Sequence, residues 1–256
     1  MLTSESETRG AQRPREDGDI LTAHDVHAGY GGFDILQGIT LAVPRHQITC
    51  IVGPNGSGKS TAFKAIYGLI KIRLGTVDFE GQNITGQRPQ DLLKLGIAML
   101  PQLSTVFPGL TVEENLALGM YVVRDKRRIK ARIDEIFDLF PRLRERRRQH
   151  ASTLSGGERR ALEIGRTLML DPRLVLLDEP SVGLSPNLVS EVFAQLVELK
   201  EETGISVLMV EQNAKSALSI SDLGYVIQRG RVSHTGSGAE LLGDPEVRHS
   251  FLGGMD

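Results

Sequence analysis

The chain has 256 residues, a formal net charge of −2, 40% hydrophobic residues and 24% charged residues. This length suits one large domain with a buried core, and the overall charge gives no indication of nucleic-acid binding. The single cysteine excludes an intrachain disulfide, and Cys50 lies in an apolar segment typical of a buried structural thiol. No apolar run approaches the ~18–20 residues of a membrane span, so we expect any link to a membrane to come through a partner.

The first residues differ sharply in composition from the rest of the chain. Residues 1–19 are polar, mixed in charge and nearly free of apolar side chains, which predicts a disordered tail. Residues 26–30 and 39–43 are then apolar segments around a turn at Gly31 and Gly32, which predicts an antiparallel hairpin. Tyr30 has two interpretations at this point, a half-buried strand tyrosine or an exposed aromatic ring that stacks on a nucleobase.

A phosphate-binding loop comes after the hairpin, because residues 53–61 read GPNGSGKST and match GxxxxGKS. An apolar segment at 47–52 precedes the loop and a helical segment at 61–67 succeeds it, which a chance glycine turn would not provide. Glycines let successive N–H groups point inward, and the helix start adds positive potential. The lysine adds a full charge at the β/γ-phosphates, and the serine hydroxyl suits Mg²⁺. We predict that a nucleotide is bound by Gly53, Pro54, Asn55, Gly56, Ser57, Gly58, Lys59, Ser60 and Thr61, with Ser60 also a Mg²⁺ ligand.

A second hairpin and a strand come next. Residues 75–84 alternate apolar and polar around a glycine turn, and residues 96–102 form a strand that ends at a proline and Gln102. The Gln102 amide offers an oxygen to Mg²⁺ and an N–H₂ group that could orient water, although alone it carries little weight. Residues 106–110 are apolar but broken by proline and glycine, so we expect a loop that tucks under the domain or meets a partner.

Residues 112–149 are predicted to be helical. One apolar face repeats at helical spacing and contains Ile129, Ile133, Ile136, Phe137 and Phe140. Residues 124–148 also contain eleven Lys/Arg and five Asp/Glu. This excess of positive charge fits a solvated helix face, and it also fits attraction to anionic lipid head groups or an acidic partner loop.

Residues 153–170 begin TLSGGERR and continue as a helix. Ser155, Gly156 and Gly157 at the helix start combine a hydroxyl, bare backbone N–H groups and the helix dipole, which is a second anion-binding arrangement. A plain N-cap is the alternative interpretation. One bound triphosphate needs only one such site in a domain, so the second requires a reason.

Two carboxylates come directly after the continuous apolar run at 174–177, which is typical of a strand covered on both faces. At the carboxyl edge of a parallel sheet, Asp178 would lie beside the phosphate loop. Asp178 can then hold Mg²⁺, and Glu179 can accept the proton of the attacking water. Without the phosphate loop, the pair would more simply be a helix cap.

The remaining segments complete an α/β pattern with a mainly parallel sheet. Residues 187–201 form an amphipathic helix, and residues 205–210 form another buried strand that ends at Glu211 and Gln212. Residues 223–235 predict a closing hairpin around Gly230, and then a short helical segment in the tail.

Taken together, these motifs resemble an ABC transporter ATP-binding subunit, from about residue 20 to the end. The order and spacing match for Tyr30, the phosphate loop, Gln102, LSGGE at 154–158 and LVLLDEP at 174–180. Within that family, TVEENL at 111–116, SVGLSP at 181–186 and VEQNA at 210–214 are similar to the branched-chain amino-acid importers. Amide and urea importers are close relatives and remain an alternative.

The resemblance implies a P-loop NTPase core, an antiparallel β subdomain and a helical subdomain at about residues 89–150, with one ABC-type domain spanning residues 20–256. It implies ATP and Mg²⁺ as cofactors, and head-to-tail pairing with a second ATP-binding subunit, identical or related. Ser155, Gly156 and Gly157 would then hold the γ-phosphate of the ATP bound to the partner chain.

The resemblance further implies membrane permease subunits, indirectly a solute-binding protein, no nucleic acid, and a peripheral position at the cytoplasmic face of the inner membrane. The permease would meet the region near Gln102 and the helical segment, with Val106, Phe107 and Leu110 as contacts. The ATPase does not touch the solute, so its sequence does not identify the solute.

Three positions depart from the usual family pattern: Gln212 replaces a histidine that touches the γ-phosphate, Ser185 replaces an aspartate, and Glu158 replaces a glutamine. We expect Gln212 to act in catalysis as a neutral donor. Soluble ABC ATPases are a second class, but they commonly carry two cassettes or a long coiled coil, whereas this chain has one of each motif and no heptad run. A small-molecule kinase would have no use for residues 154–158.

Overall fold

The computed structural model describes residues 18–251. The predicted tail lies outside this part apart from Gly18 and Asp19, and the first strand begins at Asp19, one residue inside the predicted tail. Within residues 18–251, no helix combines the length and the hydrophobicity needed to cross a membrane.

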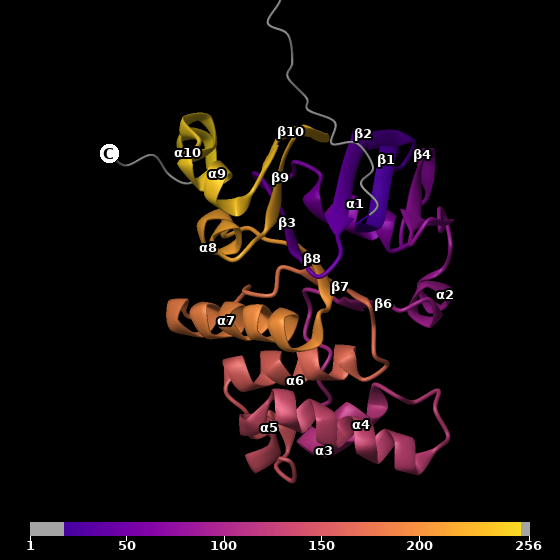
Figure 1. Ribbon diagram of the computed structural model, residues 1–256, viewed down its shortest axis with the longest axis vertical. Coiled ribbons are helices and arrows are strands. Elements are labelled where there is room, and N and C mark those ends of the chain that lie inside the picture. Colours follow the sequence, from indigo (N-terminus) through magenta and orange to yellow (C-terminus); the bar gives the residue numbers. More distant parts are fainter. Residues whose placement is uncertain (1–17, 252–256) are drawn as a thin grey trace, which may run out of the picture.

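A mainly parallel sheet forms the centre of the molecule (Figure 1). Five of its strands, in the order β9-β3-β8-β7-β6, run parallel to one another, and β10 pairs antiparallel with β9 at one edge. The strands are β3 (Ile48–Val52), β6 (Ile97–Leu100), β7 (Leu174–Asp178), β8 (Ser206–Val210), β9 (Leu223–Gln228) and β10 (Arg231–Gly236).

Both faces of this sheet are buried, which explains the continuous apolar runs of its strands. Along β7, Val175 and Leu177 face a core shared with the lower helices, whereas Leu174 and Leu176 face a second core. The side chains of β8 alternate between the same two cores. The parallel strands covered on both sides therefore carry their charged side chains at the strand ends, as Asp178 does in β7.

A second, antiparallel sheet covers the second core, in the order β2-β1-β4-β5. Its strands are β1 (Asp19–Tyr30), β2 (Phe33–Pro44), β4 (Ile72–Phe79) and β5 (Gln82–Asn83). Both predicted hairpins are present, but β1 extends well before residue 26. The pairing of β1 with β2 shifts between Ala23 and Val26, where Asp25 has a left-handed φ of 48°. This bulge interrupts the alternation on which a strand prediction relies.

Most of the helices lie in three groups, while α7 packs on α6 and α2 lies beside β6 (Figure 1). Helix α1 packs between the two sheets, α3 to α6 form the lower part of the view, and α8 to α10 lie beside β9 and β10. The helices are α1 (Lys59–Ile66), α2 (Pro89–Lys94), α3 (Val112–Leu118), α4 (Lys126–Leu139), α5 (Pro141–Glu145), η1 (Ala151–Thr153), α6 (Gly156–Leu168), α7 (Pro186–Thr203), α8 (Ala214–Ser219), α9 (Gly238–Gly243) and α10 (Pro245–Phe251).

The stretch 112–149, expected to be helical, is divided into three helices. Helix α3 ends at Gly119, which lies so close to α6 that an added Cβ would be 2.6 Å from the carbonyl oxygen of Arg166. Asp125 starts α4 by accepting from the N–H groups of Arg127 and Arg128. Pro141 starts α5, because proline cannot continue a preceding helix.

The stretch expected to be the helical subdomain, about residues 89–150, also divides in space. Helices α3, α4 and α5 pack with α6 in one core. Helix α2 instead packs beside β6, and its buried Leu92 belongs to the core under the antiparallel sheet.

Candidate functional site

The polar groups singled out in the sequence meet at the carboxyl edge of the parallel sheet. Strands β7 and β3 both flank β8, so that Val210 pairs with Asp178 on one side and with Ile51 on the other. The chain segments leaving these three strands therefore emerge side by side. They are the phosphate loop, the Asp178–Glu179 pair and the loop that carries Gln212.

The phosphate loop is shaped by glycines in positions that no other residue fits. Gly53 has a φ of 150°, and an added Cβ would lie 2.2 Å from the carbonyl oxygen of Ile227. Gly58 has a φ of 109° and stands at the start of α1, where no side chain caps the helix. The Ser57 hydroxyl is buried and has no hydrogen-bond partner among the described residues. The loop thus presents unused donors that suit phosphate oxygens.

Lys59 folds back onto this loop, where its Nζ donates to the carbonyl oxygens of Gly53 at 2.8 Å and Pro54 at 3.1 Å. Burial lowers the pKa of Lys59, and the negative charges of Glu179 and Glu211 oppose that shift. The buried Lys59 ammonium group, bonded to these two carbonyl oxygens, therefore places its positive charge at the phosphate loop.

Gln102 and Glu179, 77 residues apart in sequence, are brought into contact: Nε2 of Gln102 donates to Oε2 of Glu179 at 2.6 Å. The Glu179 backbone has a left-handed φ of 49°, which a non-glycine residue adopts only when its surroundings hold it. Its N–H donates to the Val210 carbonyl oxygen at 2.9 Å. Asp178 is buried beside it, and burial, then the charge of Glu179, raise the pKa of Asp178 against the opposing effect of Lys64.

Gln212 is exposed beside these groups, and a pocket of about 260 Å³ lies between its loop and the loop after β7. The pocket is lined by Glu179, Ser181, Val182, Glu211, Gln212 and Asn213. The sequence motifs assign no role to Glu211 or Ser181. A carboxylate directly after a buried strand, the signal that identifies Asp178, is also present at Glu211.

Ser155, Gly156 and Gly157 do not join this cluster. Within residues 18–251, no hydrogen bond or ion pair links them to the phosphate loop. Ser155 caps α6 in a reciprocal box, because its hydroxyl accepts from the Glu158 N–H and its own N–H donates to the Glu158 carboxylate. Ser155 and Gly156 are exposed.

Two leucines explain the glycines at the start of α6. An added Cβ on Gly157 would lie 2.8 Å from Leu188, and one on Gly156 would lie 3.3 Å from Leu184. Because Leu184 and Leu188 come from the turn after Glu179 and from α7, the start of α6 packs against the segment that leaves the site.

Tyr30 lies at the end of the first hairpin and is 49% exposed. Phe33, across the turn and paired with Tyr30, is 82% exposed and was not singled out from the sequence. Ile35 and Leu36 come shortly after Phe33 in β2, and their side chains would contact a Cβ added at Gly58 of the phosphate loop. The hairpin that carries the two exposed aromatic rings therefore packs against the loop.

The segment after Gln102 is tied to α6 through Glu163, which also belongs to a buried ion pair within that helix. Arg160 donates to Glu163 at 2.9 Å, and both side chains are buried. Glu163 also accepts from the Ser104 hydroxyl and from the Thr105 N–H. The segment that positions Gln102 is thus held by the helix that begins at Ser155.

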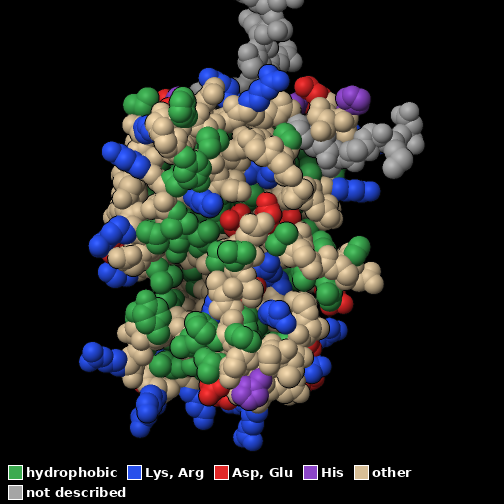
Figure 2. Space-filling view, turned by 180° about the vertical axis from the view of Figure 1, so that it is seen from behind, with side chains coloured by type: hydrophobic (Ala, Val, Ile, Leu, Met, Phe, Trp, Pro, Cys, Tyr) green, Lys and Arg blue, Asp and Glu red, His purple; other side chains and the backbone are tan. Residues whose placement is uncertain are grey.

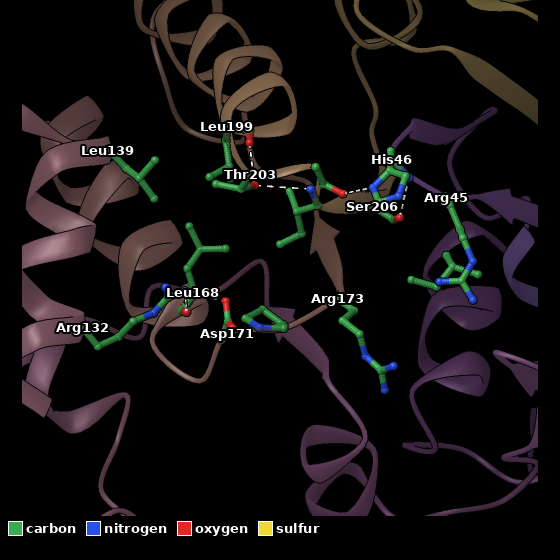
Figure 3. A pocket seen from close by; sticks show the side chains of 14 residues that line it. Arg45, His46, Arg132, Leu139, Leu168, Asp171, Arg173, Leu199, Thr203 and Ser206 are labelled. Carbon is green, nitrogen blue, oxygen red and sulfur yellow. Dashed lines mark hydrogen bonds and ion pairs between the residues drawn. The ribbon is translucent and has the colours of Figure 1, made fainter. Parts of the chain in front are cut away.

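A second pocket, of about 380 Å³, lies at the opposite, amino edge of β7 and β8 (Figure 3). Its arginines already have carboxylate partners: Arg45 and Arg173 pair with Glu80, and Arg132 pairs with Glu135 and Asp171. With these charges satisfied, the pocket is a poorer phosphate site than the loop at 53–61.

The residues at the carboxyl edge fit a nucleotide and its metal. The orphaned hydroxyl of Ser57 and the uncapped start of α1 match phosphate oxygens. The Ser60 hydroxyl, the Asp178 carboxylate and the Gln102 amide oxygen are the oxygen donors that Mg²⁺ prefers. Burial raises the pKa of Asp178, and among the described residues no positively charged group is in direct contact with its carboxylate. A cation bound beside Asp178 would reverse that shift.

Comparisons with known proteins agree with this arrangement. Residues 36–182 match the ABC transporter family model. The chain is 40% identical over 235 residues to the high-affinity branched-chain amino acid transport ATP-binding protein BraG of Pseudomonas aeruginosa, covering 92% of this chain and 100% of that protein. It is 42% identical over 237 residues to the probable branched-chain amino acid transport ATP-binding protein LivF of Archaeoglobus fulgidus, covering 93% and 100%.

A solved structure shares the fold. The ADP conformation of MJ1267, an ATP-binding cassette of an ABC transporter, has a TM-score of 0.84 and 30% sequence identity and covers 92% of this chain and 99% of that one. The predicted P-loop α/β fold is thereby confirmed. The chain belongs to the ABC transporter family.

Proposed function

We propose that this chain is the ATP-hydrolysing subunit of an ABC importer, and that the importer carries branched-chain amino acids. The observation that carries the ATPase is the convergence of the phosphate loop, Gln102 and Glu179 at one sheet edge, with Gln102 Nε2 2.6 Å from the Glu179 carboxylate. The solute class is supported by the two relatives that are 40% and 42% identical over nearly the whole chain.

In this proposal the loop binds the triphosphate through its inward N–H groups, the Ser57 hydroxyl and Lys59, which leaves its two carbonyl partners for the β/γ-phosphates. Ser60, Gln102 and Asp178 would hold Mg²⁺, which neutralises charge on the phosphate oxygens. Tyr30, with Phe33 beside it, stacks on the nucleobase.

Hydrolysis needs a base and an oriented water. Glu179 accepts a proton from water as the water oxygen bonds to the γ-phosphorus and the bond to the β,γ-bridging oxygen breaks. Gln102 already contacts this carboxylate and orients it. Gln212, exposed at the same pocket, donates its amide N–H to the γ-phosphate or the attacking water.

The exposed start of α6 supports head-to-tail pairing. Ser155 and Gly156 are exposed and lie apart from the phosphate loop of their own chain, so a γ-phosphate reaches them only from another subunit. We propose that this subunit is a second copy or a related ATP-binding subunit. The capping box still leaves the hydroxyl proton of Ser155 free to donate.

The permease is expected to dock where the segment after Gln102 meets α3 and α6. Exposed hydrophobic side chains there are Leu103, Phe107, Leu118, Tyr121 and Val122. Arg166 of α6 joins these parts, since it donates to the Thr105 carbonyl oxygen and its guanidinium lies over the Phe107 ring. Of the three contacts expected from the sequence, only Phe107 is exposed, because Val106 packs against the core and Leu110 is half-buried.

The view from behind shows hydrophobic side chains in several separate groups, with acidic side chains near the middle of the face (Figure 2).

Binding to the permease would place the chain at the cytoplasmic face of the inner membrane as a peripheral subunit. The helical subdomain in this proposal is α3 to α6, rather than the whole of residues 89–150.

Uptake measurements test this function. In a strain that lacks the gene for this chain, we expect radiolabelled leucine uptake to be restored by the wild-type chain and not by Glu179→Gln. Urea uptake in the same strains is the control. Restoration of urea uptake with no effect on leucine would instead support an amide or urea importer.

A further inference from the structure

Glu211 is the first residue after β8, and only 1% of it is exposed. A buried carboxylate is costly unless donors surround it, so its partners indicate what holds it there. Oε1 accepts from the Ser181 N–H at 2.8 Å. Oε2 accepts from the Ser181 hydroxyl at 2.8 Å and from the Gln212 N–H at 3.1 Å.

The two hydrogen bonds from Ser181 join two loops that are 30 residues apart in sequence. Ser181 comes two residues after Glu179, and Gln212 comes directly after Glu211. The backbone bond from the Glu179 N–H to the Val210 carbonyl oxygen joins the same loops one step earlier. The buried Glu211 side chain therefore holds together the two loops that line the pocket.

The geometry requires a carboxylate. Three donors converge on two oxygens, and a carboxylate only accepts, whereas a glutamine amide would turn its N–H₂ group toward at least one N–H or O–H donor. The left-handed backbone of Glu179 also depends on what anchors the chain around it.

We propose that Glu211 is a positioning residue: through Ser181 it fixes the loop of Gln212 against the loop of Glu179, so that both side chains face the γ-phosphate together. This inference rests on the proposed function, in which Glu179 and Gln212 act at the γ-phosphate. Neither Glu211 nor Ser181 touches the nucleotide in this scheme, so their loss changes turnover more than binding.

The test uses the purified full-length chain with Mg-ATP, and it measures kcat, KM, the ATP dissociation constant and the thermal midpoint. Ser181→Ala removes one donor and keeps the Glu211 charge. We expect kcat to fall roughly 10-fold, with KM and ATP affinity nearly unchanged. Ser181→Thr keeps a hydroxyl and should regain most of the lost turnover. Ser190→Ala on α7 removes an exposed hydroxyl that donates to Pro186, and it should behave as wild type.

Glu211→Gln should lower kcat at least as much as Ser181→Ala, and Ser181→Ala should add little to it because both break one clamp. The inference is overturned if Ser181→Ala matches Ser190→Ala in kcat. It is also overturned if KM rises while ATP affinity and thermal midpoint fall together with kcat, since that marks a merely structural role. If Glu211→Gln does not fold, the Ser181 variants decide. A Glu179→Gln chain with normal turnover would instead refute the proposed function, and so would a wild-type chain that has no ATPase activity either alone or with the related ATP-binding subunit.

Discussion

Two helices of this chain begin at glycine-rich turns, and their first N–H groups are in opposite situations. Helix α1 begins at Gly58, whose φ of 109° excludes a side chain, and no side chain caps it. The Ser57 hydroxyl beside it is buried without a partner among the described residues. Helix α6 begins at Ser155, which is exposed and forms a capping box with Glu158.

The difference shows what each start needs. The start of α1 is incomplete within residues 18–251, so a bound anion would supply the missing acceptors. At the start of α6, the Glu158 N–H already donates to the Ser155 hydroxyl, so an anion there would meet a partly capped helix end. Under the proposed function, a similar glycine-rich sequence binds the chain's own nucleotide in one case and contacts another subunit's nucleotide in the other.

Glu179→Gln should have the largest effect of these variants. It separates ATP binding from ATP hydrolysis, so that the contribution of each helix start to binding can be measured alone. Removing the base while keeping its shape should lower turnover by roughly 10²–10⁴-fold. ATP binding should remain, because the phosphate loop is untouched. Phosphate release under saturating Mg-ATP measures the loss, and Glu198→Gln, at an exposed position on α7, is the control. Near-normal turnover would show that another group activates the water.

Lys59→Ala tests the start of α1. Losing a charged donor from the triphosphate should weaken ATP binding by roughly 10- to 100-fold in the Glu179→Gln background. A fluorescence titration with ATP measures this, and Lys71→Ala, at an exposed position beyond the helix, should not change the affinity. An unchanged affinity for Lys59→Ala would mean that the lysine keeps its bonds to Gly53 and Pro54 when nucleotide is present.

Ser155→Arg tests the start of α6. The added bulk should prevent ATP-driven pairing while ATP affinity of the single subunit stays within about 2-fold, since no contact joins Ser155 to the phosphate loop. Size-exclusion chromatography of Glu179→Gln chains with ATP, alone or with the related subunit, measures pairing. Ser237→Arg is the matched control, because Ser237 caps α9 in the same kind of box with Glu240. A paired Ser155→Arg chain would leave Ser155 as a helix cap and nothing more.

Local patterns made much of this comparison predictable. The strands β7 and β8 are indicated by continuous apolar runs, and α7 is indicated by apolar spacing along its length. The glycines and lysine of the phosphate loop predict a phosphate site at the start of α1 from the sequence alone. Each of these signals is contained in a short window of sequence.

The features that could not be predicted depend on contacts between distant residues. The Gln102–Glu179 contact spans 77 positions, and the Glu211–Ser181 contact spans 30. Gly119, the residue that follows α3, lies against the backbone of α6, and local helix propensity contains no information about that contact. The pattern Ser155-x-x-Glu158 is typical of a helix cap, but nothing in the sequence near Ser155 shows that its hydroxyl is exposed rather than turned toward the chain's own nucleotide.

Gln212→Ala should have the smallest effect of these variants. It tests whether the γ-phosphate is contacted by a side chain of the subunit that binds the ATP as well as by a partner subunit. The Gln212 side chain is exposed and lines the pocket that Glu179 also lines. A neutral hydrogen bond contributes about 0.5–1.5 kcal/mol, so the variant should slow turnover by at most roughly 10-fold. The matched control is Asn213→Ala, which removes the cap of α8 and should lower thermal stability without slowing turnover.

The pH dependence sharpens this test, because an amide does not titrate in the accessible range. Wild-type turnover should therefore show no step near pH 6–7 from this position, whereas Gln212→His introduces an imidazole with an ordinary pKa of about 6.5 and should add one. Steady-state ATPase activity of the three chains between about pH 5.5 and 8.5 spans that value on both sides. If Gln212→Ala matches wild type throughout, the side chain makes no contact in the transition state, and Ser155 of a paired subunit becomes the better candidate for sensing the γ-phosphate.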